Sequence, residues 1–348
     1  MTERPAVLAV DGGNSKTDVV LASADGTVLG TARGPGSNHQ LVGLEAAMAV
    51  IDDAVGRACA GAGVDPASRP VAPVGAYCLA GLDFDVDKAS LGAAIASRRW
   101  SDDHVVANDT FAVWRAGTDA EWGIGVVCGT GINCAGRGPD GATVWFPSLG
   151  ELSGDLAAGG AWLGVRALGL ALRAVDGRGQ PSELAALVPA HFDRPDPLAV
   201  LEAVYTGSIP YEHLFELARV VLDAAAHGDT VARRAADELA DEVVAMVRAT
   251  VHRLHVEDRR PVVVLGGGIL QGREAGFSAR VESGIRSVAP GAEVTVLDSA
   301  PVVGAALLAL ERGDRSGSGG RPPTAERRAR LRAGLATGRS QGGRPQGG

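Results

Sequence analysis

The chain has few aromatic residues and no long apolar run. Aromatics make up 4 % of its 348 residues, although 46 % are hydrophobic, so its core must consist mainly of alanine, valine and leucine. No run of eighteen apolar residues occurs, and residues 1–5 lead directly into a strand-like segment, so we expect neither a membrane span nor a secretory signal. The length suffices for two core-forming domains of a globular, cytoplasmic protein.

Cysteine is scarce too, and several common motifs are missing. Cys59, Cys78, Cys128 and Cys134 form no CxxC pair and have apolar neighbours, which is typical of reduced, structural thiols. The sequence contains no Gly-Lys pair, which excludes a Walker-type phosphate loop. Its one G-x-S-x-G, at residues 338–342, lies in the glycine- and arginine-rich tail without the apolar strand-like run that must precede a nucleophile elbow, so a hydrolase of that type is excluded too. A formal G-x-G-x-x-G over residues 136–141 contains a proline and leads into a strand, so we interpret it as a hairpin turn.

Charge is distributed unevenly along the chain. The net charge is −8, yet residues 313–348 carry eight arginines against Asp314 and Glu326, which leaves −14 for the rest. So acidic a body argues against nucleic acid as the main partner. The tail is rich in glycine, proline and arginine, and we expect it to be disordered. A short helix over 324–335 and an RNA-binding tail remain alternatives.

The stretch from Val7 to Leu21 is the most informative one. Two apolar runs flank a turn, which predicts a β-hairpin. Glycine lets backbone N–H groups approach a phosphate, and a carboxylate at a strand end suits Mg²⁺ bound through water. An ordinary Asp-Gly hairpin turn is the alternative. The candidate phosphate and metal residues here are Asp11, Gly12, Gly13, Ser15, Lys16 and Thr17.

The remaining pattern predicts two similar α/β halves. A three-strand opening at 7–32 is repeated at 122–146, and later segments alternate strands with helices. The clearest helix, 230–255, repeats apolar residues every four positions. We expect duplicated mixed sheets, flanked by helices, that face each other across a central cleft. The expected domains are 1–110 completed by a helix at 302–312, then 111–301, then the tail at 313–348.

Three glycine turns in this order carry a family resemblance. Gly12-Gly13, Gly129-Thr130-Gly131 and Gly266-Gly267-Gly268 resemble the phosphate and adenosine motifs of the actin-like ATPases, which have a ribonuclease H-like fold. Within that superfamily the chain is most similar to the N-acetylglucosamine kinases of the BadF/BadG/BcrA/BcrD ATPase family. The resemblance covers Val7 to about Glu311.

The resemblance implies an ATP- and Mg²⁺-dependent kinase that forms the 6-phosphate of an amino sugar and acts as a homodimer. Asp11 resembles the metal residue and Asp109 the catalytic base of the family. Asp109 is alternatively a helix N-cap, and Asn38 and Asp155 are alternatively turn formers. The resemblance places the sugar at Asn38, His39, Gly81, Asp109, Thr130, Asn133, Gly150, Glu151 and Asp155.

Two alternatives concern the substrate and the chemistry. The family often has a tryptophan just before its Gly-Asp motif, whereas this chain has Ser148-Leu149-Gly150-Glu151 before Gly154-Asp155. The sugar is therefore open among N-acetylglucosamine, glucosamine, N-acetylmuramate and another hexose. Some family members instead activate radical dehydratases or reductases through an iron–sulfur cluster held by cysteines. Cys128 and Cys134 alternate with apolar neighbours, which is not typical of cluster ligands.

Overall fold

In the computed structural model, which describes residues 4–317 and 323–337, strand β1 (Val7–Gly12) is buried along its whole length. It lies at the centre of a five-stranded sheet of order β3-β2-β1-β4-β5. Strands β2 (Thr17–Ala22) and β3 (Val28–Gly34) continue the sheet antiparallel, as the predicted hairpin requires. Strands β4 (Ala72–Leu79) and β5 (Ser101–Asn108) run parallel to β1 on its other side.

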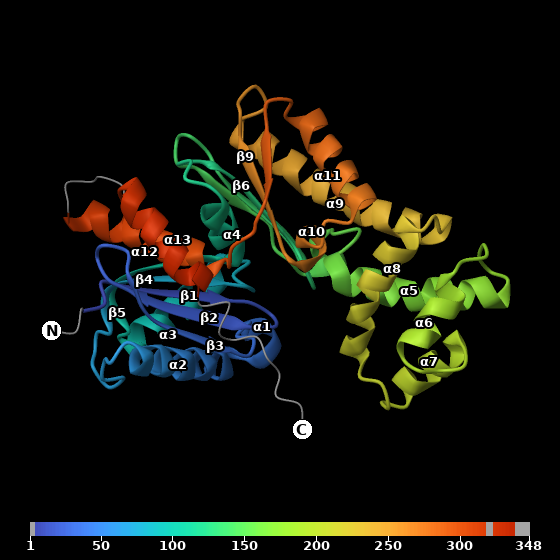
Figure 1. Cartoon of the computed structure of the whole chain (residues 1–348), viewed down its shortest axis with the longest axis horizontal. Coiled ribbons are helices and arrows are strands. Elements are labelled where there is room, and N and C mark those ends of the chain that lie inside the picture. The colour runs from blue at the N-terminus through green and yellow to red at the C-terminus, as the bar shows by residue number, and fades with distance from the viewer. Residues whose placement is uncertain (1–3, 318–322, 338–348) are drawn as a thin grey trace. The chain divides into compact units, whose positions relative to one another are not determined.

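Helices cover both faces of this first sheet (Figure 1). Helices α2 (Leu44–Gly61) and α3 (Asp85–Arg98) lie on one face, preceded by the short α1 (His39–Val42). Helices α4 (Asp109–Gly117) and α12 (Val302–Gly317) pack against each other and against β1 and β4 on the other. That crossing is close, because a Cβ at Gly304 of α12 would collide with the carbonyl oxygen of Ala112.

The second sheet has the same construction, with order β10-β9-β6-β7-β8. Strand β6 (Gly123–Cys128) pairs antiparallel with β7 (Ile132–Arg137), which pairs antiparallel with β8 (Thr143–Trp145). Strands β9 (Val262–Gly266) and β10 (Glu293–Val296) run parallel to β6. Both predictions are confirmed here: the three-strand opening is repeated, and residues 138–142 form a turn between β7 and β8.

Most helices around the second sheet match the sequence pattern. The long α9 (Thr230–Leu254) packs on β7 with its predicted stripe, of which only Val231 is half-exposed. The sequence did not predict α11 (Ala275–Val288), whose buried side chains pack on α9. The other elements here are η1 (Gly150–Ser153), α5 (Gly159–Asp176), α6 (Leu184–His191), α7 (Pro197–Tyr205), η2 (Tyr211–Glu216), α8 (Leu217–Ala226) and α10 (Gly268–Gln271).

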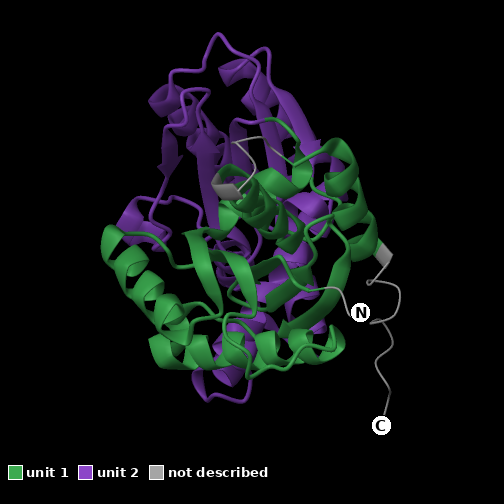
Figure 2. Ribbon diagram, turned by 90° about the vertical axis from the view of Figure 1, so that its left-hand side faces the viewer, with its two compact units in different colours: residues 1–120, 297–348 green, residues 121–296 purple. Residues whose placement is uncertain are grey.

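The chain divides into two units, coloured separately in Figure 2. Unit 1 comprises residues 1–120 and 297–348, and unit 2 comprises residues 121–296. The predicted boundary after residue 110 therefore falls inside α4, which belongs wholly to unit 1. Each unit has its own hydrophobic core, built on its own sheet.

The predicted disorder of residues 313–348 is wrong for the part of the tail that the structure describes. Helix α12 continues to residue 317, and α13 (Ala325–Thr337) follows, with Leu331 fully buried. Its arginines meet carboxylates of unit 1: Arg327 lies 2.8 Å from Asp314 and Arg332 lies 2.9 Å from Asp119. Acidic residues of unit 1 thus form ion pairs with arginines of α13, which the composition alone suggests are solvated. Residues 318–322 and 338–348 lie outside the described residues.

Across residues 4–317 and 323–337, none of the helices is both long and apolar enough to cross a membrane.

Candidate functional site

The turn between β1 and β2 is shaped by packing as well as by its predicted phosphate role. A Cβ at Gly12 would collide with the side chains of Ser37 and Leu79, so the glycine is required for close approach. The Gly13 N–H donates to Lys16 O at 2.8 Å, and Ser37 N–H donates to Gly13 O at 3.1 Å. The following loop is therefore fastened to this turn.

Three polar side chains of this turn point in different directions. Ser15 is exposed, whereas Thr17 is buried with its hydroxyl oxygen 2.7 Å from Pro35 O. Lys16 Nζ lies 2.7 Å from Asp18, which Arg33 also contacts at 2.6 Å. Burial opposes ionisation of Asp18, but these two cations hold the pKa of its carboxyl below the usual value. Thr17 therefore has a structural role, and Lys16 is held by a carboxylate that the sequence did not single out.

Carboxylates gather where three parallel strands of unit 1 end. Asp11 lies near the end of β1, Asp109 directly follows β5, and Asp83 lies in the loop after β4. Burial, and then the negative charge of Asp109, raise the pKa of Asp11 to about 8. Burial also raises the pKa of Asp109 to about 6, and the charge of Asp83 contributes to that rise. Neighbouring carboxyl groups whose pKa values are raised by burial and by one another's negative charge are typical of catalytic and metal-binding sites.

Asp109 is not the N-cap of its helix. Asn108 has extended backbone angles, and its side-chain oxygen accepts from Thr110 N–H at 3.0 Å, so Asn108 caps α4. Asp109 is the first residue of the helix, where a carboxylate benefits from the helix dipole. Capping therefore does not account for Asp109, and the alternative drawn from the sequence is wrong.

Three of the predicted sugar residues of unit 1, Asn38, His39 and Gly81, lie together. Asn38 is buried and caps the short α1: its Oδ1 accepts from Gln40 N–H at 2.9 Å, and its Nδ2 donates to Asn14 Oδ1 at 2.8 Å. Gly81 has a φ of +79° and presses against Asn38 Oδ1, where a Cβ would collide. His39 follows Asn38 and pairs with Asp87 at 3.2 Å. Asn38 thus forms a turn, as the alternative held, and still lies beside two other predicted residues.

In unit 2 the glycine turns converge on the end of β6. Gly129 and Thr130 accept backbone hydrogen bonds of 2.8 Å from Gly160 and Ala161 at the start of α5. A Cβ at Gly267 would collide with the backbone of Cys128, so the turn after β9 also packs on this strand end. The structure therefore brings residues 129–131 and 266–268 together, as predicted. It adds Gly159 and Gly160, which the sequence pattern did not assign to the site.

The remaining predicted residues of unit 2 lie on β7 and the loop after β8. Asn133 is buried on β7, and its Oδ1 accepts from the adjacent Cys134 N–H at 2.7 Å. Gly150 and Glu151 begin η1, where Glu151 is exposed. Asp155 is buried, its Oδ2 lies 3.1 Å from Ser153 Oγ, and its backbone N–H donates to Gly150 O.

Several site residues had no recognisable signal in the sequence. Asn14, Gln40, Asp83 and Asp87 contact the predicted sugar residues only because loops distant in sequence meet. Glu242 of α9 is another: burial, together with the charge of Asp155, raises the pKa of its carboxyl. Gly159-Gly160 was the exception, since a glycine pair at a helix start is a visible sign of close backbone packing.

All four cysteines are free and fully buried. Burial raises the pKa of the thiols of Cys128 and Cys134 to about 12, so they stay protonated at neutral pH. Cluster ligands must be thiolates, so these residues do not favour the iron–sulfur alternative.

Comparison with known proteins gives a family match and two similar proteins that are named as sugar kinases. The family model described as the BadF/BadG/BcrA/BcrD ATPase family matches residues 8–309. The chain is 27 % identical over 267 residues to an N-acetylmuramic acid/N-acetylglucosamine kinase of Clostridium acetobutylicum, covering 76 % of this chain and 85 % of that one. It is 25 % identical over 313 residues to the N-acetyl-D-glucosamine kinase of Dictyostelium discoideum, covering 87 % and 97 %.

A solved structure from Chromobacterium violaceum, assigned as an N-acetylglucosamine kinase, superposes with a TM-score of 0.69 at 26 % identity. The match covers 88 % of this chain and 99 % of that one. The predicted fold class is confirmed by this similarity together with the two mixed sheets.

Proposed function

We propose that this chain, which belongs to the BadF/BadG/BcrA/BcrD ATPase family, is a kinase that converts N-acetylglucosamine to its 6-phosphate with ATP. Two relatives named for phosphorylating this amino sugar match most of its length. The observation that carries the proposal is the cluster of Asp11, Asp83 and Asp109 at the ends of three parallel strands. In open α/β sheets, substrates bind at this edge.

Asp109 would act as the general base. Its carboxylate accepts the proton of the sugar 6-hydroxyl while that oxygen attacks the γ-phosphorus of ATP. The bond from phosphorus to the β–γ bridging oxygen breaks, and ADP leaves. A pKa of about 6 keeps Asp109 ionised at neutral pH, yet makes it a stronger base than an ordinary aspartate.

The residues around Asp11 fit a magnesium ion. Asp11 is only 6 % exposed, and the ionised form of its carboxyl is disfavoured by burial and by Asp109. A divalent cation would relieve both effects. Within the described ranges no three His, Cys, Asp or Glu side chains are placed to coordinate a metal ion together. Mg²⁺ commonly keeps several waters and binds through one or two carboxylates together with substrate phosphates. Bound there, Mg²⁺ would neutralise charge on the phosphates.

The glycine turns of unit 2 would take the nucleotide. Residues 129–131 and 266–268 come together at the end of β6 with little side-chain bulk, so a phosphate chain can approach the backbone closely. Thr130 is exposed in this group and adds a hydroxyl donor. Transfer of a phosphoryl group depends on such positioning and charge stabilisation more than on covalent chemistry.

The identity of the sugar is the most specific part of the proposal. The loop that carries Asp155 exposes Leu149, Leu152 and Leu156, and it lacks the tryptophan that the family often has just before its Gly-Asp motif. One relative is named for N-acetylmuramic acid as well as for N-acetylglucosamine. N-acetylmuramate, with its additional lactyl group, is therefore the second candidate.

A coupled assay of ADP release over about a dozen amino sugars and hexoses tests the proposal. We expect the highest kcat/KM with N-acetylglucosamine, no rate without Mg²⁺, and a product whose phosphate NMR shows a 6-phosphomonoester. A higher kcat/KM with N-acetylmuramate would replace the substrate but keep the reaction. Absence of ADP release with every sugar would overturn the function.

A cytoplasmic location and a homodimer remain predictions. The first rests on the use of ATP in the proposed reaction. The second rests on the family resemblance alone.

A further inference from the structure

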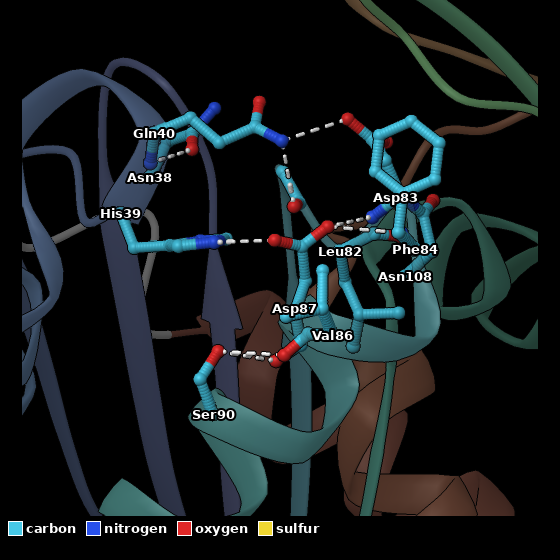
Figure 3. Close-up of polar contacts among 11 residues, drawn as sticks. Asn38, His39, Gln40, Leu82, Asp83, Phe84, Val86, Asp87, Ser90 and Asn108 are labelled. Atoms are coloured by element: carbon cyan, nitrogen blue, oxygen red, sulfur yellow. Dashed lines mark hydrogen bonds and ion pairs between the residues drawn. The ribbon is translucent and has the colours of Figure 1, made fainter.

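Two loops of unit 1 are joined by side-chain contacts beside the predicted sugar residues (Figure 3). Gln40 Nε2 donates to Gly81 O at 3.0 Å and to Asp83 Oδ2 at 2.9 Å. One residue earlier, His39 Nε2 lies 3.2 Å from Asp87 Oδ1. We call these contacts the loop clasp. It links residues 39–40 at the start of α1 to residues 81–87, more than forty positions away.

The far side of the clasp is itself rigid. Asp87 Oδ2 accepts from the N–H groups of Phe84 at 2.9 Å and Asp83 at 3.2 Å, which fixes the start of α3. Asp83 is 4 % exposed. Leu82 O lies 3.4 Å from Asn108 Nδ2, and Asn108 caps the helix that begins with Asp109. The loop that receives Gln40 therefore also touches the residue next to the proposed base.

The near side of the clasp is tied to the β1–β2 turn at Ser37 and Asn38, and the clasp adds a restraint on the residues that follow them. Helix α1 has only four residues, far fewer than an isolated helix needs to be stable in water. Gln40 is exposed, so burial of its side chain does not hold the segment in place. Its two hydrogen bonds to residues 81 and 83, with the pair formed by His39, supply that restraint.

The restraint matters because the side-chain amide of Asn38 still has hydrogen-bonding capacity for a sugar. A side-chain amide has two N–H donors and two acceptor lone pairs. Asn38 uses one donor on Asn14 and one lone pair on Gln40 N–H, which leaves one of each for a sugar hydroxyl. Their directions are fixed only while residues 38–40 cannot rotate. A hydrogen bond misplaced by an ångström contributes little to binding or orientation.

We propose that Gln40 and Asp83 are positioning residues that hold Asn38 in the orientation that binds sugar. The inference rests on the proposed function. The clasp acts on the sugar through Asn38, and it contains none of the residues proposed to bind the nucleotide. Loss of the clasp should therefore weaken sugar binding without altering the apparent affinity for ATP.

The test compares Gln40→Ala, Gln40→Glu and Asp53→Ala in the full-length protein. Asp53 lies on the exposed side of α2 and pairs with Arg57, so it serves as a matched control for the loss of one polar surface side chain. Gln40→Glu keeps the size of the side chain, removes both donors and adds a like charge next to Asp83. Steady-state kinetics with N-acetylglucosamine and ATP are combined with amide hydrogen exchange of residues 38–43 without ligands.

We expect Gln40→Ala to raise the KM for sugar about tenfold, the scale of one or two hydrogen bonds, and Gln40→Glu to raise it at least as much. The KM for ATP and the melting temperature should stay near those of the wild type, and exchange of residues 38–43 should accelerate. Asp53→Ala should change none of these.

Three results would contradict the proposal, and they are distinguishable. Unchanged exchange in both Gln40 variants would show that the clasp does not restrain the segment. Faster exchange with unchanged sugar KM and kcat, measured against an active wild type, would show a restraint without a positioning role. A wild type that phosphorylates no sugar would overturn the proposed function and this inference with it.

Discussion

The ionised carboxyl of Asp11 lowers the stability of the fold, although the proposed magnesium site requires it. Its carboxyl is buried on β1 next to Asp109, and both circumstances raise its pKa, to about 8. A folded-state pKa above the unfolded value means that stability is greatest at low pH and falls as the pH rises through the folded pKa. The window for Asp11 runs from about pH 4 to about pH 8. A protein without a cation at this site therefore becomes less stable across that range.

Asp11→Asn should remove this dependence. In EDTA, we expect the variant to melt a few degrees above the wild type at pH 8 and close to it at pH 5, because asparagine never acquires the buried charge. Mg²⁺ should raise the melting temperature of the wild type at pH 8 but not that of the variant. Asp53→Asn, an exposed control, should shift both temperatures alike. A pH-independent difference for Asp11→Asn would refute this explanation.

Asp109→Asn should leave the fold intact, because Asn108 rather than Asp109 caps α4. Asparagine keeps the size of the side chain but cannot accept the hydroxyl proton, so turnover should fall by about 10²–10⁴-fold. Binding of nucleotide, measured by calorimetry, should persist. Wild-type turnover in a folded variant would show that Asp109 is not the base.

The pH profile provides a separate check on the same carboxylate. With a pKa of about 6, the ionised base is lost as the pH falls, so kcat/KM should decline about tenfold per unit below pH 6. Asp83→Asn removes a negative charge that raises this pKa, so the declining limb should move to lower pH. It retains an acceptor for Gln40, so the sugar KM at pH 8 should change little. A limb that does not move would exclude Asp83 as a neighbour of the base.

At the scale of elements, α13 shows what composition cannot reveal. Its arginines look solvated in sequence, yet Arg328 and Arg332 both contact Asp119, and Arg330 pairs with Asp25 of the β2–β3 turn. Burial opposes ionisation of Asp119, but these arginines hold the pKa of its carboxyl below the usual value. Such pairs contribute little individually at a surface, so the buried Leu331 supplies most of the docking.

Leu331→Asp should release α13 from unit 1. A charge cannot replace a fully buried leucine without large cost, so we expect the melting temperature to fall by a few degrees and trypsin to cleave within 324–337 much faster. Ala329→Asp, on the exposed side of the same helix, adds the same charge and should do neither. Equal behaviour of the two variants would mean that α13 is not docked in solution.

The sequence predicted elements well where apolar periodicity and residue propensity agree, and it failed where the two conflict. The strands of both sheets and the long α9 were found because their apolar spacing is regular. Helix α11 was missed although Phe277, Val281 and Ile285 repeat every four residues, because Gly276 and Gly284 lower its helix propensity. Gly284 is explained only by the structure, where a Cβ would collide with Val244 of α9.

The site was predictable to the extent that single residues have recognisable chemistry. Asp11, Asp109 and the glycine turns follow strand ends, which sequence can locate. Their partners Asn14, Gln40 and Asp83 became identifiable only once loops separated by dozens of residues met. A hydrogen bond between distant loops leaves no periodic signal in one sequence.

On the scale of the whole molecule, the two units differ in how the chain builds them. Unit 2 is one continuous segment, whereas unit 1 needs residues 1–120 and the segment after 296. Helix α12 packs on α4 and β1, and Arg115, which is nearly fully buried, pairs with Glu311 of α12. Without the C-terminal segment, the guanidinium of Arg115 and one face of the sheet of unit 1 would be exposed to solvent.

Residues 121–296 should therefore fold alone, and residues 1–120 should not. The core of unit 2 is complete within its own segment, so we expect a cooperative thermal transition and dispersed amide NMR signals from the isolated fragment. Residues 1–120 expose the apolar surface meant for α12 and lose the pair between Arg115 and Glu311, so the burial that stabilises the sheet is missing. Adding residues 297–337 through a flexible linker should restore a cooperative transition to that fragment. A disordered 121–296 fragment would show instead that contacts with unit 1 are needed to complete unit 2, and a cooperatively folded 1–120 fragment would show that α12 is dispensable.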